Sequence, residues 1–126
     1  MVVLDTNIII DHLRQKDSKD SYLMNIVKDY PNETLAISII SIQELYEGKS
    51  TQDKKKEQFL VDTLKPLEIL AYTEDIAKLA GTLARDLARP IELADAAIAA
   101  TVIINQATLF TLNKKDFKDI KKLKLL

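Results

Sequence analysis

The sequence has no cysteine, a single histidine and no apolar run long enough to cross a bilayer. Without cysteine there are neither disulfides nor thiolate-bound metals, and one histidine excludes a histidine-rich zinc site. The stretch 96–104 is apolar or small throughout, but it is much shorter than the ~20 residues of a membrane span. The N-terminal apolar run has no basic leader and is interrupted by Asp5, so we expect no signal peptide and a cytoplasmic protein.

An excess of charge of one sign is also missing. Lys and Arg number 18 against 19 Asp and Glu, so the whole-chain charge gives no sign of a nucleic-acid-binding protein. Lysines nevertheless gather at 54–56 and again between 113 and 126. Most lysine clusters are solvated surface, and each of these taken alone favours that interpretation.

The 126 residues, 47% of them hydrophobic, are expected to form one domain over residues 1–126. Short apolar runs predict strands, and longer segments with helical spacing predict helices. We expect strands at 1–4, 35–40, 67–70 and 108–111, with 123–126 as a candidate edge strand. We expect helices at 7–13, 22–30, 41–47, 53–64, 75–87 and 94–105, a polar loop at 17–20, and a short helix or turn at 114–120. This alternation predicts an α/β domain with a mostly parallel sheet of four to five strands.

Four acidic residues are predicted to meet at the carboxyl edge of that sheet, where open α/β folds bind ligands. Asp5 directly follows the first strand, and Glu44 lies in the first turn of the helix after the second strand. Asp95 begins the helix that leads through a short link to the fourth strand, and Asp116 follows that strand. If the sheet is parallel, all four acids therefore converge.

Each acid also has an ordinary structural explanation. A carboxylate near a helix start satisfies free backbone N–H groups or favours the helix dipole. The alternatives are a capping box at Ser41-Ile42-Gln43-Glu44, N-terminal caps at Asp5 and Asp95, and a cap with a dipole partner at Asn113 and Asp116.

The convergence itself favours a metal site. Clustered carboxylates repel, and burying them is costly unless a cation or protons compensate. An oxygen-only set of ligands without cysteine or histidine suits Mg²⁺ or Mn²⁺. Asp95 is the only charge in a long apolar run, so we expect it to have a cationic partner.

The motifs resemble those of PIN-domain nucleases, and more narrowly of VapC-type toxins from type II toxin–antitoxin systems. The resemblance rests on Asp5-Thr6-Asn7, Ser41-x-x-Glu44, Asp95-Ala-Ala-Ile-Ala-Ala and Thr111-x-Asn113-x-x-Asp116-Phe117. It implies a three-layer αβα fold, Mg²⁺- or Mn²⁺-dependent endoribonuclease activity, homodimerisation and inhibition by a cognate antitoxin. One departure is Pro90-Ile91-Glu92-Leu93, where many relatives carry a glycine and where Glu92 adds another acid.

The resemblance also implies roles for individual residues. Asp5 and Asp95 are expected to bind the metal directly. Glu44 and Asp116 are expected to bind it as well, either directly or through water, or to orient the nucleophile. A metal-activated water then cuts RNA phosphodiester bonds. Residues expected to hold the carboxylates in place are Thr6, Asn7, Thr111 and Asn113. RNA is expected to bind lysines beside Asp116, in preference to those at 54–56: Lys114, Lys115 and Lys118. For His12 we expect a surface or structural role and not that of a general base.

Other functions remain open at this stage. A phosphatase of the haloacid dehalogenase type needs an acid where Asn7 stands, and a receiver domain needs neighbouring acids after its first strand. Nucleases that act on structured DNA usually need further domains. The strongest alternative is a non-catalytic metal- or RNA-binding module with the same fold, although the presence of all four acids argues against it.

Overall fold

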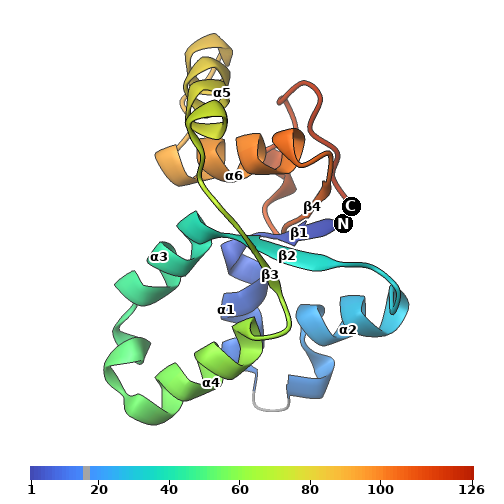
Figure 1. Cartoon of the computed structure of the whole chain (residues 1–126), viewed down its shortest axis with the longest axis vertical. Coiled ribbons are helices and arrows are strands. Elements are labelled where there is room, and N and C mark those ends of the chain that lie inside the picture. Colours follow the sequence, from blue (N-terminus) through green and yellow to red (C-terminus); the bar gives the residue numbers. More distant parts are fainter. Residues whose placement is uncertain (16–17) are drawn as a thin grey trace.

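A computed structural model describes residues 1–15 and 18–126 of the chain (Figure 1). The four strands of its sheet all run parallel, in the order β3-β2-β1-β4. The strands are β1 (Val2–Leu4), β2 (Leu35–Ser38), β3 (Glu68–Leu70) and β4 (Thr108–Phe110). The predicted parallel sheet is therefore confirmed. The candidate edge strand at 123–126 is reduced to one parallel bridge between Leu109 and Leu125.

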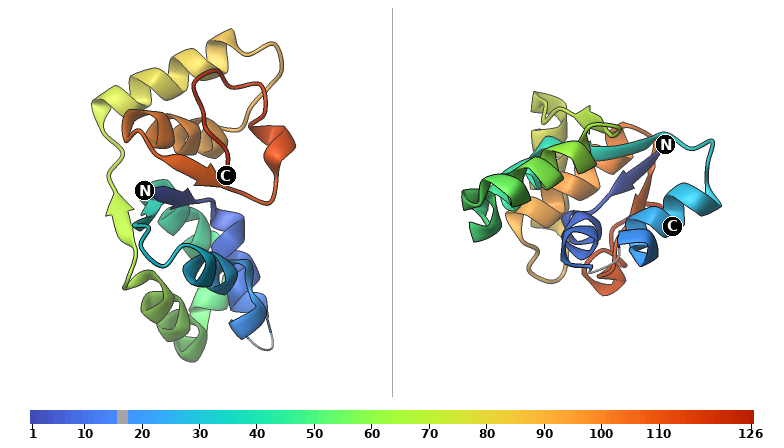
Figure 2. Two further views of the ribbon diagram at one scale, coloured as in Figure 1. Left: turned by 90° about the vertical axis from the view of Figure 1, so that its right-hand side faces the viewer. Right: turned by 90° about the horizontal axis from the view of Figure 1, so that it is seen from below.

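Helices cover both faces of the sheet, which makes the three-layer αβα arrangement (Figures 1 and 2). One layer consists of α1 (Thr6–Arg14), α2 (Tyr22–Asp29), α3 (Ile39–Glu47) and α4 (Lys54–Leu64). The other consists of α5 (Glu74–Asp86) and α6 (Leu93–Ile104). Three short 3₁₀ helices complete the described chain: η1 (Ser18–Asp20), η2 (Lys49–Gln52) and η3 (Lys114–Asp116).

The alternation of side chains along β1 divides the core between the two helical layers. Val2 and Leu4 pack with α1, α2 and α4, whereas Val3 packs on the opposite face with α6. Helix α6 is buried from Ala96 to Val102, as its nearly uniform apolar sequence predicts. No helix in the described part of the chain is long and apolar enough to cross a membrane.

Side-chain caps start most of the helices. Asp5 accepts a hydrogen bond from the Thr6 backbone N–H at the start of α1, and Ser21 accepts one from Met24 in α2. Asp53 and Thr73 play the same part for α4 and α5. Such caps satisfy backbone N–H groups that have no partner within the helix, which explains where these helices begin.

Helix α3 starts earlier than the sequence predicted. Strand β2 ends at Ser38, whose hydroxyl accepts from the Ile40 backbone N–H and caps α3. The expected strand to residue 40 and helix start at Ser41 are wrong, because the chain turns directly from strand into helix. The capping box at 41–44 is also wrong, because Ser41 lies inside the helix and leaves Glu44 free for another role.

The prediction of a short helix or turn at 114–120 is confirmed, because the 3₁₀ helix η3 is followed there by turn residues. The polar loop expected at 17–20 differs from the prediction. In the expected polar loop at 17–20, Asp17 lies outside the described residues, and η1 occupies the remainder. This difference does not change the position of the carboxyl edge, where β1 and β4 lead to Asp5 and Thr111.

Candidate functional site

Asp5 lies at the carboxyl end of the central strand and is almost completely buried, with 5% of its surface exposed. Its Oδ1 accepts from the Thr6 backbone N–H at 2.8 Å, and its Oδ2 accepts from the Thr111 hydroxyl at 2.6 Å. Burial raises the pKa of Asp5, although these hydrogen bonds act in the opposite direction. Asp5 therefore does cap α1, and its second carboxylate oxygen is held by Thr111, the residue that follows β4.

Thr111 connects the ends of β1 and β4. Its hydroxyl oxygen, besides donating to Asp5, accepts from the Asn113 backbone N–H at 3.0 Å and lies 3.4 Å from Asn7 Nδ2. The side-chain oxygen of Asn7, Oδ1, in turn accepts from the Leu112 backbone N–H at 3.3 Å. Asn7 and Thr111 thus hold the site through their side chains, whereas Asn113 contributes its backbone and makes no side-chain cap for η3.

Glu44 is attached to the same edge through Thr6. The Thr6 hydroxyl donates to Glu44 Oε1 at 2.7 Å and lies 2.8 Å from the Ser41 hydroxyl. Ser41 is completely buried, so its hydroxyl needs this partner. The sequence analysis considered Ser41 only as a helix start; a small polar residue on the inward face of α3 was the available signal for its actual role.

Asp95 projects from the first turn of α6, where Glu92 is the residue at the N-cap position and makes no side-chain cap. Burial raises the pKa of Asp95 to about 6, and repulsion from Asp5, Asp116, Glu92 and Glu44 adds to the effect. Asp95 lines one hollow with Asp116 and Glu92, and Glu92 lines a second hollow with Glu44. Thr6, whose hydroxyl donates to Glu44, also gives its backbone N–H to Asp5, so the four predicted acids lie at the same edge of the sheet. The structure also adds Glu92, the extra acid in the segment Pro90-Ile91-Glu92-Leu93.

Asp116 is half-buried at the end of η3 and lines a hollow with Asp95 and Glu92. Arg89 lines the same hollow, but its guanidinium donates to the backbone carbonyl of Asp116 at 2.7 Å and to the Asp119 carboxylate at 3.3 Å. Its charge is therefore directed to the outside of the cluster. The sequence held no pattern that singled out Arg89.

Comparison with known proteins agrees with this geometry. The family model described as "PIN domain" matches residues 2–123. The chain belongs to the PIN-domain family. Ribonuclease VapC10 of Mycobacterium tuberculosis is 33% identical over 127 aligned positions, which cover 98% of this chain and 91% of the relative.

Solved structures related to this PIN domain include two complexes. VapBC2 of Rickettsia felis, bound to a promoter DNA fragment, has a chain with 35% identity and a TM-score of 0.84, and the match covers 100% of this chain and 98% of that one. A toxin–antitoxin complex from Klebsiella pneumoniae has 28% identity and a TM-score of 0.76, with 98% and 95% of the two chains covered.

The donor set of this PIN domain, carboxylate oxygens alone, suits a hard divalent cation in its chemistry. In residues 1–15 and 18–126, no lysine or arginine forms an ion pair with the carboxylate of Asp5, Glu44, Asp95 or Asp116. The cationic partner expected for Asp95 is thus not a side chain of the described protein. Across the same residues, no three acidic or histidine side chains are already arranged as ligands of one ion. The acids form a concentrated negative site and not a finished coordination sphere.

The lysines predicted to bind RNA are not part of this hollow. Lys114 and Lys115 lie in η3 and Lys118 just beyond it, and all three are exposed. The residues that line the hollow beside Asp116 include Arg89 and none of these lysines.

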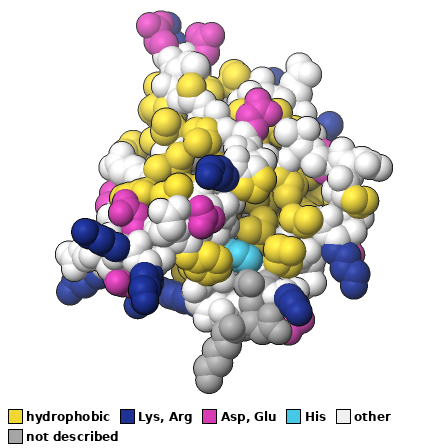
Figure 3. Space-filling model, turned by 60° about the horizontal axis from the view of Figure 1, so that its bottom comes forward, with side chains coloured by type: hydrophobic (Ala, Val, Ile, Leu, Met, Phe, Trp, Pro, Cys, Tyr) yellow, Lys and Arg dark blue, Asp and Glu magenta, His cyan; other side chains and the backbone are white. Residues whose placement is uncertain are grey.

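His12 has a structural position, which agrees with the expected surface or structural role. Only 6% of its surface is exposed, its Nδ1 lies 2.7 Å from the Ser21 hydroxyl, and its ring packs against Phe59 with centroids 5.5 Å apart. Burial lowers its pKa. Apolar side chains surround the histidine on the face shown in Figure 3.

Proposed function

We propose that this PIN domain is a metal-dependent endoribonuclease and the toxin of a toxin–antitoxin pair. The proposal is supported by the placement of four carboxylates from separate segments at one edge of the sheet. Relatives named ribonuclease VapC, similar over nearly the whole chain, support RNA as the substrate class.

Asp5, Glu44, Asp95 and Asp116 would hold Mg²⁺ or Mn²⁺. When bound, the ion supplies positive charge that activates water and stabilises the charge developing at the scissile phosphate. Thr111 keeps both oxygens of Asp5 oriented together with the α1 backbone, and Thr6 keeps Glu44 turned toward the cluster. Because these donors are already in place, little reorganisation is needed when substrate arrives.

The partners follow from the same relatives. We expect the chain to act in the cytoplasm, to bind a cognate antitoxin and to form a homodimer. The face beside Glu44 is suited to self-association, because Leu93 and Tyr72 line a hollow with Glu44 and Leu93 is 87% exposed. The amphipathic helix α5 offers less to a partner, because it uses its apolar face inside the core, where Ile76 packs with Ala96 of α6.

The test is cleavage of a mixed RNA pool that includes structured RNAs, by purified protein free of antitoxin. Reactions with Mg²⁺, with Mn²⁺ and with EDTA are compared for wild type, Asp5→Asn and Asp95→Asn. We expect cleavage by wild type only with metal, and a loss of at least ~100-fold in both variants because each removes a charge that binds metal.

Asp75→Asn is the matched control, because Asp75 is an exposed acid in the first turn of α5. It removes the same charge away from the site and should cleave like wild type. Equal cleavage by Asp5→Asn would show that the four acids are not the catalytic site. A folded wild type that binds metal or RNA but cuts nothing would support the non-catalytic module instead.

A further inference from the structure

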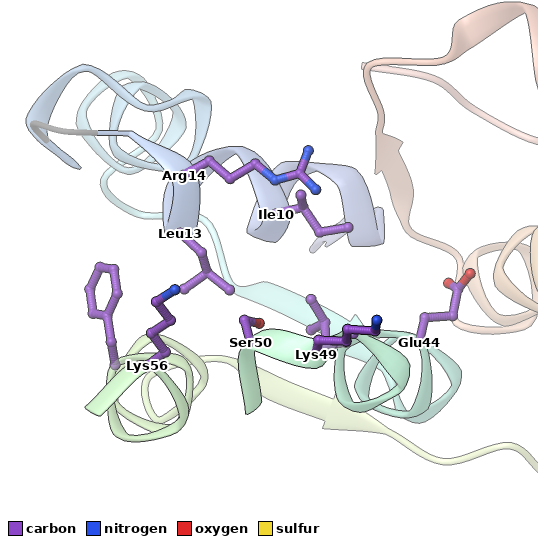
Figure 4. Close-up of a pocket in the computed structure, with 10 residues that line it drawn as sticks. Ile10, Leu13, Arg14, Glu44, Lys49, Ser50 and Lys56 are labelled. Atoms are coloured by element: carbon purple, nitrogen blue, oxygen red, sulfur yellow. The ribbon is translucent and has the colours of Figure 1, made fainter. Parts of the chain in front are cut away.

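A groove of about 460 Å³ runs away from the acidic cluster between α1, η2 and α4, and Glu44 lies at one end of it (Figure 4). Its lining includes three basic side chains from three different elements: Arg14, Lys49 and Lys56. In Figure 4 Arg14 extends from α1, Lys56 lies on the opposite wall on α4, and Lys49 extends in the direction of Glu44.

Within the part of the chain that the structure describes, these cations have no carboxylate partners. Across residues 1–15 and 18–126, none of the ion pairs involves Arg14, Lys49 or Lys56. All three side chains are exposed, so they remain available to a ligand. Three unpaired cations around one groove create a local positive field, which a polyanion can neutralise.

The hollows on the other sides of the cluster have the opposite charge. The hollow at the start of α6 contains Glu92, Asp95 and Asp116 against one arginine, Arg89. The hollow between α3 and α6 has three glutamates and no cation among its lining residues. An RNA strand approaching the cluster is therefore repelled along these two sides and attracted along the groove that ends at Glu44.

We propose that single-stranded RNA reaches the acidic site through this groove, with its phosphates bound by Arg14, Lys49 and Lys56. The proposal rests on the ribonuclease function proposed above, and it competes with the predicted binding of RNA by Lys114, Lys115 and Lys118. The groove has the volume of a small-ligand cleft, which is the scale of a few nucleotide groups and not of a whole folded RNA. Phe59, also in the lining and 40% exposed, offers an aromatic face on which a base stacks.

The test measures binding and not cleavage. A short fluorophore-labelled single-stranded RNA of mixed sequence is titrated with protein in EDTA, and anisotropy is recorded over a range of salt concentrations. For single strands each phosphate contact contributes about 0.7 to the slope of log affinity against log salt. Loss of three contacts should lower the slope by about 2 and weaken binding roughly 50-fold at about 0.15 M salt.

Three variants, each lacking three positive charges, are compared with wild type. The groove variant carries Arg14→Gln, Lys49→Gln and Lys56→Gln. The variant of the competing site carries Lys114→Gln, Lys115→Gln and Lys118→Gln. The distant control carries Lys28→Gln, Lys65→Gln and Lys121→Gln, all at exposed positions. Because the net charge changes equally in all three variants, a difference in their RNA affinity shows where on the surface the RNA binds.

We expect the full loss only in the groove variant, and a further several-fold loss from Phe59→Leu. The proposal is overturned if the groove variant binds RNA within about threefold of the distant control, or if the variant of the competing site shows the larger loss. The same variants are also titrated with labelled poly-glutamate. The proposal is overturned if the groove variant keeps RNA binding but loses affinity for poly-glutamate, because the groove then accepts an acidic peptide. Since EDTA prevents metal-dependent cleavage, a failure of the nuclease proposal would appear separately, as absent cleavage with normal binding.

Discussion

Replacing Asp95 by asparagine should stabilise the metal-free protein while abolishing its activity. Burial and four neighbouring acids raise the pKa of Asp95 from 3.8 to about 6. A shift of this size corresponds to roughly 3 kcal/mol. Asp95 is only half-buried, so solvent screening reduces the expected contribution to about 1–2 kcal/mol.

The sign of the effect depends on pH. A carboxyl whose pKa is raised in the folded state favours the fold while it is protonated. This contribution is complete below pH 3.8 and is lost as the pH rises through about 6. Asp95→Asn removes the ionisation, so its free energy of unfolding should equal that of wild type near pH 3.8. Above pH 6 it should exceed the wild-type value by about 1–2 kcal/mol.

The assay is urea unfolding in EDTA at several pH values, analysed as the difference between variant and wild type. The difference is needed because His12, whose pKa is lowered, makes the wild type less stable as the pH falls through its usual range. Asp75→Asn is the control and should change stability by less than about 0.5 kcal/mol at every pH. A difference for Asp95→Asn that does not vary with pH, or a destabilisation at neutral pH, would refute the reasoning.

Two further predictions concern the residues that support the site and the fold. Thr111→Val removes the hydroxyl that donates to Asp5 Oδ2, so the pKa of Asp5 should rise further. The pH profile of RNA cleavage should therefore move to higher pH. An unmoved profile would show that this hydrogen bond does not lower the pKa of the carboxyl. Ser21→Ala removes the cap of α2 and the hydrogen-bond partner of His12. The free energy of unfolding in urea should fall by about 1–3 kcal/mol, with RNA cleavage unchanged. An unaltered unfolding curve would contradict the role given to Ser21.

The fold could be predicted largely from local pattern. Buried parallel strands have short apolar runs, and surface helices have regular apolar spacing, so both are readable without knowing what they contact. The parallel order of the strands then places the ends of β1 and β4 at one edge, which is why Asp5, Glu44, Asp95 and Asp116 could be expected to converge. The errors came where one residue has two possible partners: Ser41 could have capped a helix, but Ser38 caps α3 and Ser41 faces Thr6.

Only the tertiary structure decided which charges are paired and which surround a groove. Lys114, Lys115 and Lys118 were attractive because they adjoin Asp116 in sequence, yet the hollow there contains Arg89 and not these lysines. The basic groove combines α1, η2 and α4, which no sequence spacing relates. Local order along the chain therefore determined the strands, the helices and the edge where the acids meet. The electrostatic field around those acids depends on long-range packing, and it required the folded structure.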